Sequence, residues 1–334
     1  MDMQYTSNPG LKNMDLPFEW KGTPVDSRGR FVNHELVHNH SFLEFLKWRL
    51  QENPQGEEKK NERWAPEIIP EDHFLSSGED CIVWLGHASF FIRLAGQTLL
   101  IDPVFFNIPV IRRRTPLPVD PLKFKGLDYI LVSHNHRDHC DEKSLRLLAA
   151  GNQQATYLTG LKLDKLIRKF TGSSKIQAAG WYQQYDTASA INVFYLPSRH
   201  WAKRGLTDFN EELWGAFVIQ GAGKTIYFGG DSGYGGHFKD VARIFPQIDY
   251  CMIGVGAYKP EFFMAQSHSS PQDAVKAAND LNARVFIPMH YGTFDLADEP
   301  MGEPLRILAQ LEAAHKINPE LKVLKIGEEL LLNQ

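Results

Sequence analysis

Short apolar runs separated by turns begin at residue 81 and predict the first β-strands of the main part of the chain. We expect strands at residues 81–85, 89–94 and 98–101, with a hairpin turn at 95–97. Residues 129–132 form a continuous apolar run, which is typical of a strand buried on both faces. Regular structure here therefore starts with a β-sheet.

Helical spacing of apolar residues follows at 142–150 and 161–171. A second group of strands is expected next, with a turn at 221–223 inside it, and strands then alternate with helices. These elements are strands at 191–195, 214–220, 224–228 and 250–254, a helix at 271–281, a strand at 285–288, a helix at 304–315 and a last strand near 321–326.

Each of the two strand groups includes a hairpin strand that leads to an aspartate, Asp102 in the first group and Asp231 in the second. Strands followed by helices, twice over, predict an α+β fold in which two mixed β-sheets pack between two layers of helices. In such a four-layer αββα sandwich, built as a pseudo-duplication, we expect both aspartates at the same edge.

Residues 1–78 differ in composition from residues 79–334. They are rich in Pro, Asn, Glu and Lys, and residues 51–63 have the composition of a solvated charged linker. Residues 42–50 have the pattern of a short amphipathic helix, which either docks on the main domain or lies at a membrane or partner interface. We therefore expect an N-terminal extension, residues 1–78, packed on a main domain, residues 79–334.

Composition narrows the class of protein. The chain has 334 residues, 43% of them apolar and 23% charged, which is ordinary for a globular protein. Its net charge of −4 provides no basic field, so we expect no nucleic-acid partner. Three widely spaced cysteines form no disulfide framework, and we find neither a signal peptide nor a membrane-spanning apolar run. We expect a cytoplasmic protein, with peripheral membrane contact and oligomer formation both left open.

The densest cluster of potential metal ligands directly follows the strand at 129–132. His134, His136, Asp138 and His139 lie within six residues, and such a cluster arises by accident in about one chain in a thousand of this composition. A strand end that presents four ligands at one point can hold two metal ions a few ångströms apart. The sequence therefore predicts a dinuclear metal site.

Two ions need further ligands, and His200, Asp231 and His290 each follow an apolar strand. Any one of these alone is more often an ordinary polar residue, but their joint placement favours a common site. Residue types favour two Zn²⁺ ions, with Mn²⁺ or Fe as alternatives, and a carboxylate is the natural bridge between them. From spacing, the first ion takes His134, His136 and His200, the second takes Asp138, His139 and His290, and Asp231 bridges the two.

Further segments extend the pattern over about residues 80 to 300. They are Trp84-Leu-Gly-His-Ala-Ser89, Ser133 to His139, His200-Trp-Ala-Lys-Arg204, Leu213-Trp-Gly215, Gly229-Gly-Asp-Ser-Gly-Tyr234, Gly256-Ala-Tyr258, Phe263-Met264, His268 and His290-Tyr-Gly-Thr-Phe294. In this order they resemble the N-acyl-phosphatidylethanolamine-hydrolysing phospholipase D branch of the metallo-β-lactamase superfamily. The αββα fold of that superfamily matches the layout expected above. Arg137 departs from the pattern, since the mammalian phospholipase has an aromatic residue there.

The resemblance implies the same ligand sets and adds His268 as a further active-site histidine. We name His268 and Asp138 as catalytic candidates, and His268 would donate a proton to a phosphoryl oxygen or to the leaving group. His268 can otherwise be a supporting or surface histidine. Asp102 and His87 are expected to support the ligands from behind, because metal-bound side chains need outer hydrogen-bond partners.

The expected function is that of a dinuclear zinc hydrolase that cleaves a phosphodiester, in a phospholipase D-type reaction on N-acyl-phosphatidylethanolamine-like lipids. Two cations activate a shared water and stabilise charge on the phosphoryl group. The apolar loop at 104–111, its basic end at 112–114 and the segment 261–264 either face acyl chains and an anionic head group or pack as ordinary loops.

Three alternatives stay open. The same centre can attack a carbonyl, which would make the protein a lactonase or acyl-ester hydrolase. A metal-stabilised lipid-binding protein without turnover is the non-enzymatic alternative. Finally, residues 34–38 fit the His-Glu-x-x-His pattern of zinc proteases, but that pattern arises by chance in about one chain in thirty and lies here in the polar N-terminal region.

Overall fold

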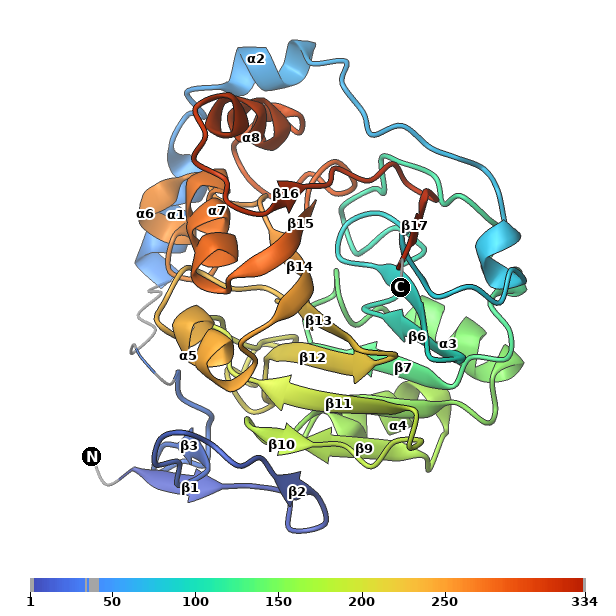
Figure 1. Ribbon diagram of the computed structural model, residues 1–334. Helices are drawn as coiled ribbons and strands as arrows, with labels where there is room; N and C mark the ends of the chain where they lie inside the picture. The colour runs from blue at the N-terminus through green and yellow to red at the C-terminus, as the bar shows by residue number, and fades with distance from the viewer. Residues whose placement is uncertain (1–2, 34, 36–41, 333–334) are drawn as a thin grey trace.

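The computed structural model describes residues 3–33, 35 and 42–332. Its N-terminal part contains short strands and helices that lie on the outside of a larger body (Figure 1). These elements are β1 (Gln4–Thr6), β2 (Lys12–Asn13), β3 (Thr23–Val25), α1 (Phe42–Leu50), α2 (Gly56–Asn61) and the 3₁₀ helix η1 (His73–Leu75). β1 pairs with β3, and β2 joins the edge of one of the two large sheets.

The first large sheet has the order β17-β4-β5-β6-β7-β8-β9 in the described part of the chain. Its β6–β7–β8–β9 portion is parallel, and the rest is antiparallel. Four of its strands were predicted, but β8, β9 and β17 were not. The strands are β4 (Cys81–Trp84), β5 (Phe90–Leu94), β6 (Gln97–Ile101), β7 (Tyr129–Val132), β8 (Thr156–Gly160), β9 (Ile176–Ala179) and β17 (Glu329–Leu331).

The second large sheet has the order β16-β15-β14-β13-β12-β11-β10-β2 among the described residues and is also mixed. The last strand expected near 321–326 is only the two-residue β16. The strands that complete this sheet are β10 (Gln183–Gln184), β11 (Ile191–Leu196), β12 (Ala216–Gly221), β13 (Lys224–Phe228), β14 (Ile248–Gly254), β15 (Ala283–Met289) and β16 (Glu320–Leu321).

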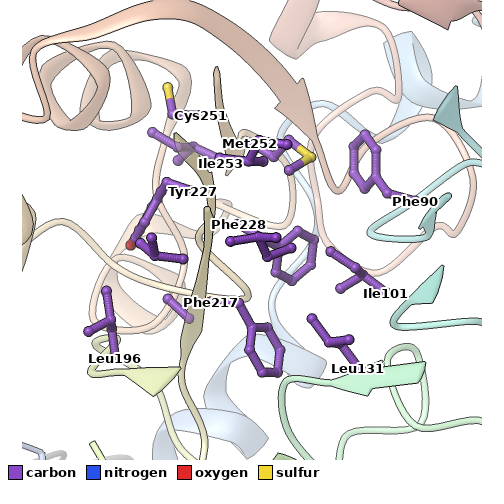
Figure 2. Packing of buried hydrophobic residues seen from close by; sticks show 14 of the residues in the cluster. Phe90, Ile101, Leu131, Leu196, Phe217, Tyr227, Phe228, Cys251, Met252 and Ile253 are labelled. Carbon is purple, nitrogen blue, oxygen red and sulfur yellow. The ribbon is translucent and has the colours of Figure 1, made fainter. Parts of the chain in front are cut away.

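Side-chain alternation along the strands builds the core between the sheets. In β4, Ile82 belongs to the cluster between the sheets, whereas its neighbour Val83 belongs to the cluster on the outer face. Figure 2 shows Phe90 and Ile101 of the first sheet opposite Phe228 of the second. Because successive strand residues point to opposite faces, one apolar run serves two cores.

Helices cover the outer faces of both sheets. Side chains of α3 and α4 pack in the outer cluster of the first sheet, and α7 contacts β14 and β15 of the second. The two sheets between these helix layers make the predicted four-layer αββα sandwich (Figure 1). The remaining helices are α3 (Glu142–Gly151), α4 (Asp164–Thr171), α5 (His237–Ile244), α6 (Glu261–Met264), α7 (Pro271–Asp280), α8 (Glu303–Ala313) and the 3₁₀ helix η2 (Pro121–Lys123).

The N-terminal part contacts the body through polar and aromatic side chains. The predicted helix 42–50 is α1, whose Trp48 donates from Nε1 to Asp298 Oδ1 at 3.0 Å and stacks on Phe263. α2 lies beside α8 (Figure 1), where Glu58 pairs with Arg306 at 2.7 Å. These contacts hold both helices against the C-terminal half of the chain.

The three cysteines are free and buried: Cys81 lies in β4, Cys251 in β14, and Cys140 in the loop before α3. Burial raises the pKa of the Cys81 and Cys140 thiols to about 12 each. Within the described ranges, no helix combines the length and the apolar character needed to cross a lipid bilayer.

Candidate metal centre

The predicted ligand cluster occupies the loop between β7 and α3, and Asp102 holds it in place. Parallel pairing of β6 with β7 brings the ends of both strands to the same edge. There Ser133 donates its backbone N–H to Asp102 Oδ1 at 2.7 Å, and His139 Nδ1 lies 2.7 Å from Asp102 Oδ2. Asp102 is fully buried. It therefore fixes the start of the loop and the orientation of one imidazole, as expected of a supporting residue.

Three imidazoles and one carboxylate form the first set of candidate ligands. His136 Nδ1 lies 2.9 Å from His134 Nε2 and 3.1 Å from His200 Nε2. Asp231 Oδ2 lies 3.9 Å and 3.6 Å from those two Nε2 atoms, respectively. Two nitrogen ligands at zinc bond lengths in a tetrahedron are about 3.4 Å apart. The four donor atoms are therefore spaced as ligands of one ion.

A second set lies on the other side of the same loop. Asp138 Oδ2 is 3.7 Å from His139 Nε2, 3.6 Å from His290 Nε2 and 3.1 Å from His87 Nε2. The donor atoms of these four residues lie within 4.8 Å of one another. His87 was expected to support the ligands from behind, and the contact of its Nε2 with Asp138 is compatible with that role. The same nitrogen lies close enough to the other three donor atoms to make His87 a candidate ligand as well.

Asp231 lies between the two sets. Its Oδ2 is 3.2 Å from His139 Nε2, and its Oδ1 is 3.1 Å from His290 Nε2. Together with its contacts to the first set, this gives one carboxylate access to both groups of imidazoles. A shared carboxylate is the arrangement that a bridging ligand requires.

Unpartnered nitrogens provide an independent test of whether these residues suit metal ions. Buried nitrogens without a hydrogen-bond partner are costly, because they have lost water and gained nothing in exchange. A cation that accepts a nitrogen lone pair removes that cost, so the residues fit a metal site. Among the described residues, two of the nitrogens assigned above as donors are of this kind, His139 Nε2 and His290 Nε2.

The electrostatics of the cluster favour cations. Burial lowers the pKa of His136 and His268 to about 4, which leaves both imidazoles neutral near pH 7. For His290, burial acts in the same direction, but the Asp231 and Asp138 carboxylates raise its pKa to about 9. Burial alone would raise the pKa of Asp231, yet the charges of His139 and His290 hold it well below its usual range. The ionised carboxylates thus stabilise positive charge in the cluster, and metal ions would supply that charge.

The structure brings all seven predicted ligands to one edge of the sandwich, and His268 lies beside them. His268 Nδ1 is 3.9 Å from Asp231 Oδ2, and its ring is 5.2 Å from that of His200. His268, Asp231 and His290 also form a group that could hold an ion. Arg137, between two predicted ligands, is exposed.

Sequence comparison identifies the family. The model of the β-lactamase superfamily domain matches residues 97–291, more than half of the chain. The chain belongs to this superfamily.

Individual superfamily relatives agree with the assignment. The chain is 30% identical over 248 residues to N-acyl-phosphatidylethanolamine-hydrolyzing phospholipase D 1 of Caenorhabditis elegans. The alignment covers 70% of this chain and 68% of that protein. It is 28% identical over 254 residues to a UPF0173 metal-dependent hydrolase of Pelotomaculum thermopropionicum, covering 75% and 99% of the two chains. The sequence prediction of the superfamily and of this phospholipase-like branch is confirmed, and the chain is a metal-dependent hydrolase of the superfamily.

Solved structures of the superfamily share the fold. The metallo-β-lactamase fold protein YhfI from Bacillus subtilis superimposes with a TM-score of 0.53 at 16% sequence identity, covering 75% of this chain and 99% of YhfI. At that identity the likeness concerns the fold alone. The predicted αββα architecture is therefore confirmed.

Sequence reasoning missed residues that hold the ligand loop from the side. Arg204 Nη1 donates to the carbonyl oxygens of Asn135 at 2.9 Å and Cys140 at 2.7 Å, the two ends of the loop. Tyr195 donates its hydroxyl to the Ser133 carbonyl at 2.8 Å. Arg204 belongs to one of the segments that carried the family resemblance, so the sequence did single it out. Its partners could not be predicted, because they are backbone carbonyls and no sequence pattern reveals such contacts.

Packing explains most of the apolar loop and its basic end. Val104 is buried in a cluster with Phe294. Arg113 donates from Nη1 to the Val104 carbonyl at 2.7 Å, and Arg114 pairs with Asp295 at 2.8 Å. The sequence left two interpretations of this loop open, contact with a lipid substrate and ordinary packing. Ordinary packing accounts for Arg113 and Arg114. An anionic head group would have to compete with those contacts.

The His-Glu-x-x-His pattern falls mostly outside the described residues. Of residues 34–38 the structure describes Glu35, whose Oε2 accepts a hydrogen bond from Gly236 N at 2.8 Å. That carboxylate therefore contacts the loop that follows Asp231.

Proposed function

We propose that this chain is a dinuclear metal phosphodiesterase that cleaves N-acyl-phosphatidylethanolamine-like lipids in a phospholipase D-type hydrolysis. The observation that carries the proposal is the position of Asp231, one carboxylate within 3.9 Å of imidazoles from both ligand sets. The similarity to the phospholipase of Caenorhabditis elegans supports the choice of substrate.

Zinc is the proposed metal, because the sets are rich in imidazole and joined by a carboxylate. Divalent cations in such a pair of sites supply Lewis acidity and activate water near neutral pH. The proposed ligands are His134, His136, His200 and Asp231 for one ion, and Asp138, His139, His290 and Asp231 for the other, with His87 beside the second set.

His268 is proposed to donate a hydrogen bond to the substrate. Its ring is neutral near pH 7, because burial lowers its pKa to about 4. A neutral imidazole carries one N–H, which can donate a hydrogen bond to a phosphoryl oxygen and so stabilise the negative charge that develops there. His268 also lines a cavity of about 430 Å³ together with Glu261 and Ser270. His268 therefore borders both the candidate metal centre and this cavity, whose wall contains none of the seven proposed ligands.

Apolar side chains near this cavity support a lipid substrate. α6, which supplies Glu261 to the cavity wall, also carries Phe262, which is 42% exposed. Lys47 of the adjacent α1 lies over the Phe262 ring, and Leu50 of α1 is 84% exposed. Apolar side chains with a neighbouring cation suit contact with the surface of an anionic membrane. This arrangement supports the proposed peripheral membrane contact.

Metal content and product release test the proposal together. Purified protein loaded with Zn²⁺ and dialysed should hold two ions per chain by elemental analysis. It should release N-acylethanolamine from N-acyl-phosphatidylethanolamine in mixed micelles and leave a lactone intact. The His136→Ala variant should lose one ion and the turnover. Lactone cleavage without phosphodiester cleavage, or two ions without turnover of either substrate, would contradict the proposed reaction.

A further inference from the structure

A short N-terminal segment crosses two of the three loops that supply ligands from outside the dense cluster, those of His200 and Asp231. We define this segment, Phe31–Asn33 and Glu35, as the N-terminal strap. Phe31 donates its backbone N–H to the Asn210 carbonyl at 2.8 Å, within the loop that follows His200. At the other end, Glu35 Oε2 accepts from Gly236 N at 2.8 Å, five residues after Asp231.

Asn33 contacts the backbone of His200 through both ends of its side-chain amide. Its Nδ2 donates to the His200 carbonyl at 2.8 Å, and its Oδ1 accepts from the His200 N–H at 3.2 Å. Asn33 is 8% exposed and His200 is fully buried. Two reciprocal hydrogen bonds in a buried place fix both the position and the tilt of one peptide segment, although 167 residues separate the partners along the chain.

Backbone position matters at His200 because the residue lies in irregular structure. β11 ends at Leu196, and His200 comes four residues later in a loop. Its ring is oriented separately, since Nδ1 lies 2.9 Å from the Ser267 carbonyl. That contact turns Nε2 toward His136. Metal–ligand distances tolerate only about 0.2 Å, so a shift of the His200 backbone would move Nε2 out of bonding range.

The strap also spans the connection between the two ligand loops. Arg199 donates its N–H to Ser232 Oγ at 3.0 Å, and Gly233 donates to the Arg199 carbonyl at 2.9 Å. Glu35 lies against the same loop, since a Cβ on Gly235 would lie 2.5 Å from Glu35 Oε2. His200 and Asp231 therefore belong to one hydrogen-bonded unit that the strap crosses.

We infer that Asn33 is a positioning residue of the metal centre. It fixes the backbone of His200 and thereby sets the affinity of the ion that His200, His134 and His136 hold. The inference rests on the proposed metal-binding role of His200. It assigns the N-terminal extension a part in the chemistry of the site, because a residue outside the superfamily domain completes the support of one ligand.

Asn33→Ala tests the inference, with Asn8→Ala as a matched control. Asn8 lies in the same N-terminal extension and also uses its side-chain amide on backbone partners: Nδ2 donates to the Ala178 carbonyl at 2.8 Å, and Oδ1 accepts from Gly10 N at 2.9 Å. Both substitutions therefore remove two hydrogen bonds to backbone partners, those of Asn8 being more exposed, but only Asn33 touches a predicted ligand. Zn²⁺ affinity is measured by competition with a chromophoric chelator, and the Co²⁺-loaded protein is examined by visible absorption.

Asn33→Ala should weaken binding of one of the two ions by roughly tenfold and alter the Co²⁺ spectrum, as expected when the support of a ligand is lost. Asn8→Ala should bind both ions as the unsubstituted protein does. Unchanged affinities and an unchanged spectrum in Asn33→Ala would overturn the inference. The inference would also be overturned if Asn33→Ala weakened the binding of both ions equally and lowered the Tm of the metal-free protein to a matching degree. That result would mean that Asn33 stabilises the fold in general and does not position one ligand.

His200→Ala separates this inference from the proposed function. If His200→Ala weakens one ion while Asn33→Ala does not, the positioning role is wrong and the metal role of His200 stands. If His200→Ala keeps both ions at full affinity, the proposed ligand set itself is wrong. Should Asn33→Ala not fold, Asn33→Asp retains the acceptor for the His200 N–H and is judged by the same measurements.

Discussion

Asp231 is the residue at which the two candidate metal sets meet, and its charge can be removed without changing its size. Asp231→Asn removes the negative charge and replaces one carboxylate oxygen with an amide nitrogen, which cannot bind a cation. Because Asp231 contacts His139 at 3.2 Å and His290 at 3.1 Å as well as the first set, we expect both ions to bind more weakly. Turnover should fall by more than about 100-fold, since even residues behind a ligand cost 10–100-fold. Elemental analysis after dialysis measures the loss.

Asp249→Asn is the matched control for this prediction. Asp249 is a buried aspartate in β14 that accepts from Thr225 N at 2.8 Å, and it is not among the predicted ligands. Its substitution should leave both ions bound. Loss of a single ion from Asp231→Asn would contradict the bridging position.

His268 can be separated from the metal ligands by what its loss leaves behind. His268→Ala should keep both ions, because neither proposed set needs it, and should lower the rate by about 100-fold or more, the usual cost of removing one hydrogen-bond donor that stabilises charge in the transition state. The measurements are metal content and the maximal rate. Exposed His73, which pairs with Glu329 on the surface, provides the control His73→Ala, which should change neither. Loss of an ion in His268→Ala would instead make it a ligand.

At the scale of single residues, the predicted ligands came from one rule, that each follows an apolar strand. Strand ends meet at an edge, so the rule brought Asp231 and His290 to the site although they are far apart in sequence. The same rule could not find Asn33. An asparagine is common in loops, and its contact with His200 exists only because the extension folds back over the main domain.

At the scale of elements, the prediction failed where a strand or helix depends on its neighbours. β8 (Thr156–Gly160) contains Thr and Tyr, which favour strands, but the run is only five residues long, and its position between β7 and β9 in the sheet decides its conformation. α5 (His237–Ile244) begins at Gly236 without a side-chain cap, so no start signal precedes it. Amphipathic and capped elements were found, such as α7 with Ser270 at its N-cap.

The ligand loop is an element whose stability depends on Arg204. Its Nη1 donates to the Asn135 and Cys140 carbonyls, and its guanidinium lies over the Phe170 ring. Arg204→Met should lower the free energy of unfolding by about 2 kcal/mol, because two carbonyls lose their partner. Chemical denaturation of the metal-free protein measures the change. Lys203→Met removes the same charge from an exposed neighbour and should stay within about 0.5 kcal/mol; an equal effect would assign the loss to charge alone.

At the scale of the whole molecule, loops of the two sheets and the N-terminal extension meet at the candidate centre. The loop after β7 comes from the first sheet, Asp231 and His290 follow strands of the second, and Asn33 comes from the extension. A metal pair would therefore join parts of the chain that are otherwise held by packing. Binding at the centre should then stabilise the fold as a unit.

Removal of metal should therefore lower the thermal stability of the whole protein. An ion present at a thousand times its dissociation constant stabilises the folded state by about 4 kcal/mol, which corresponds to a fall in Tm on the order of 10 °C on chelation. Calorimetry with Zn²⁺ and with a chelator measures the difference. Asp231→Asn, which lacks the shared carboxylate, should show a much smaller difference, whereas Asp249→Asn should show the full one. Identical melting with and without chelator would mean that the centre binds no ion tightly. An ion held by these buried imidazoles binds only the folded chain, and such binding must stabilise the folded state.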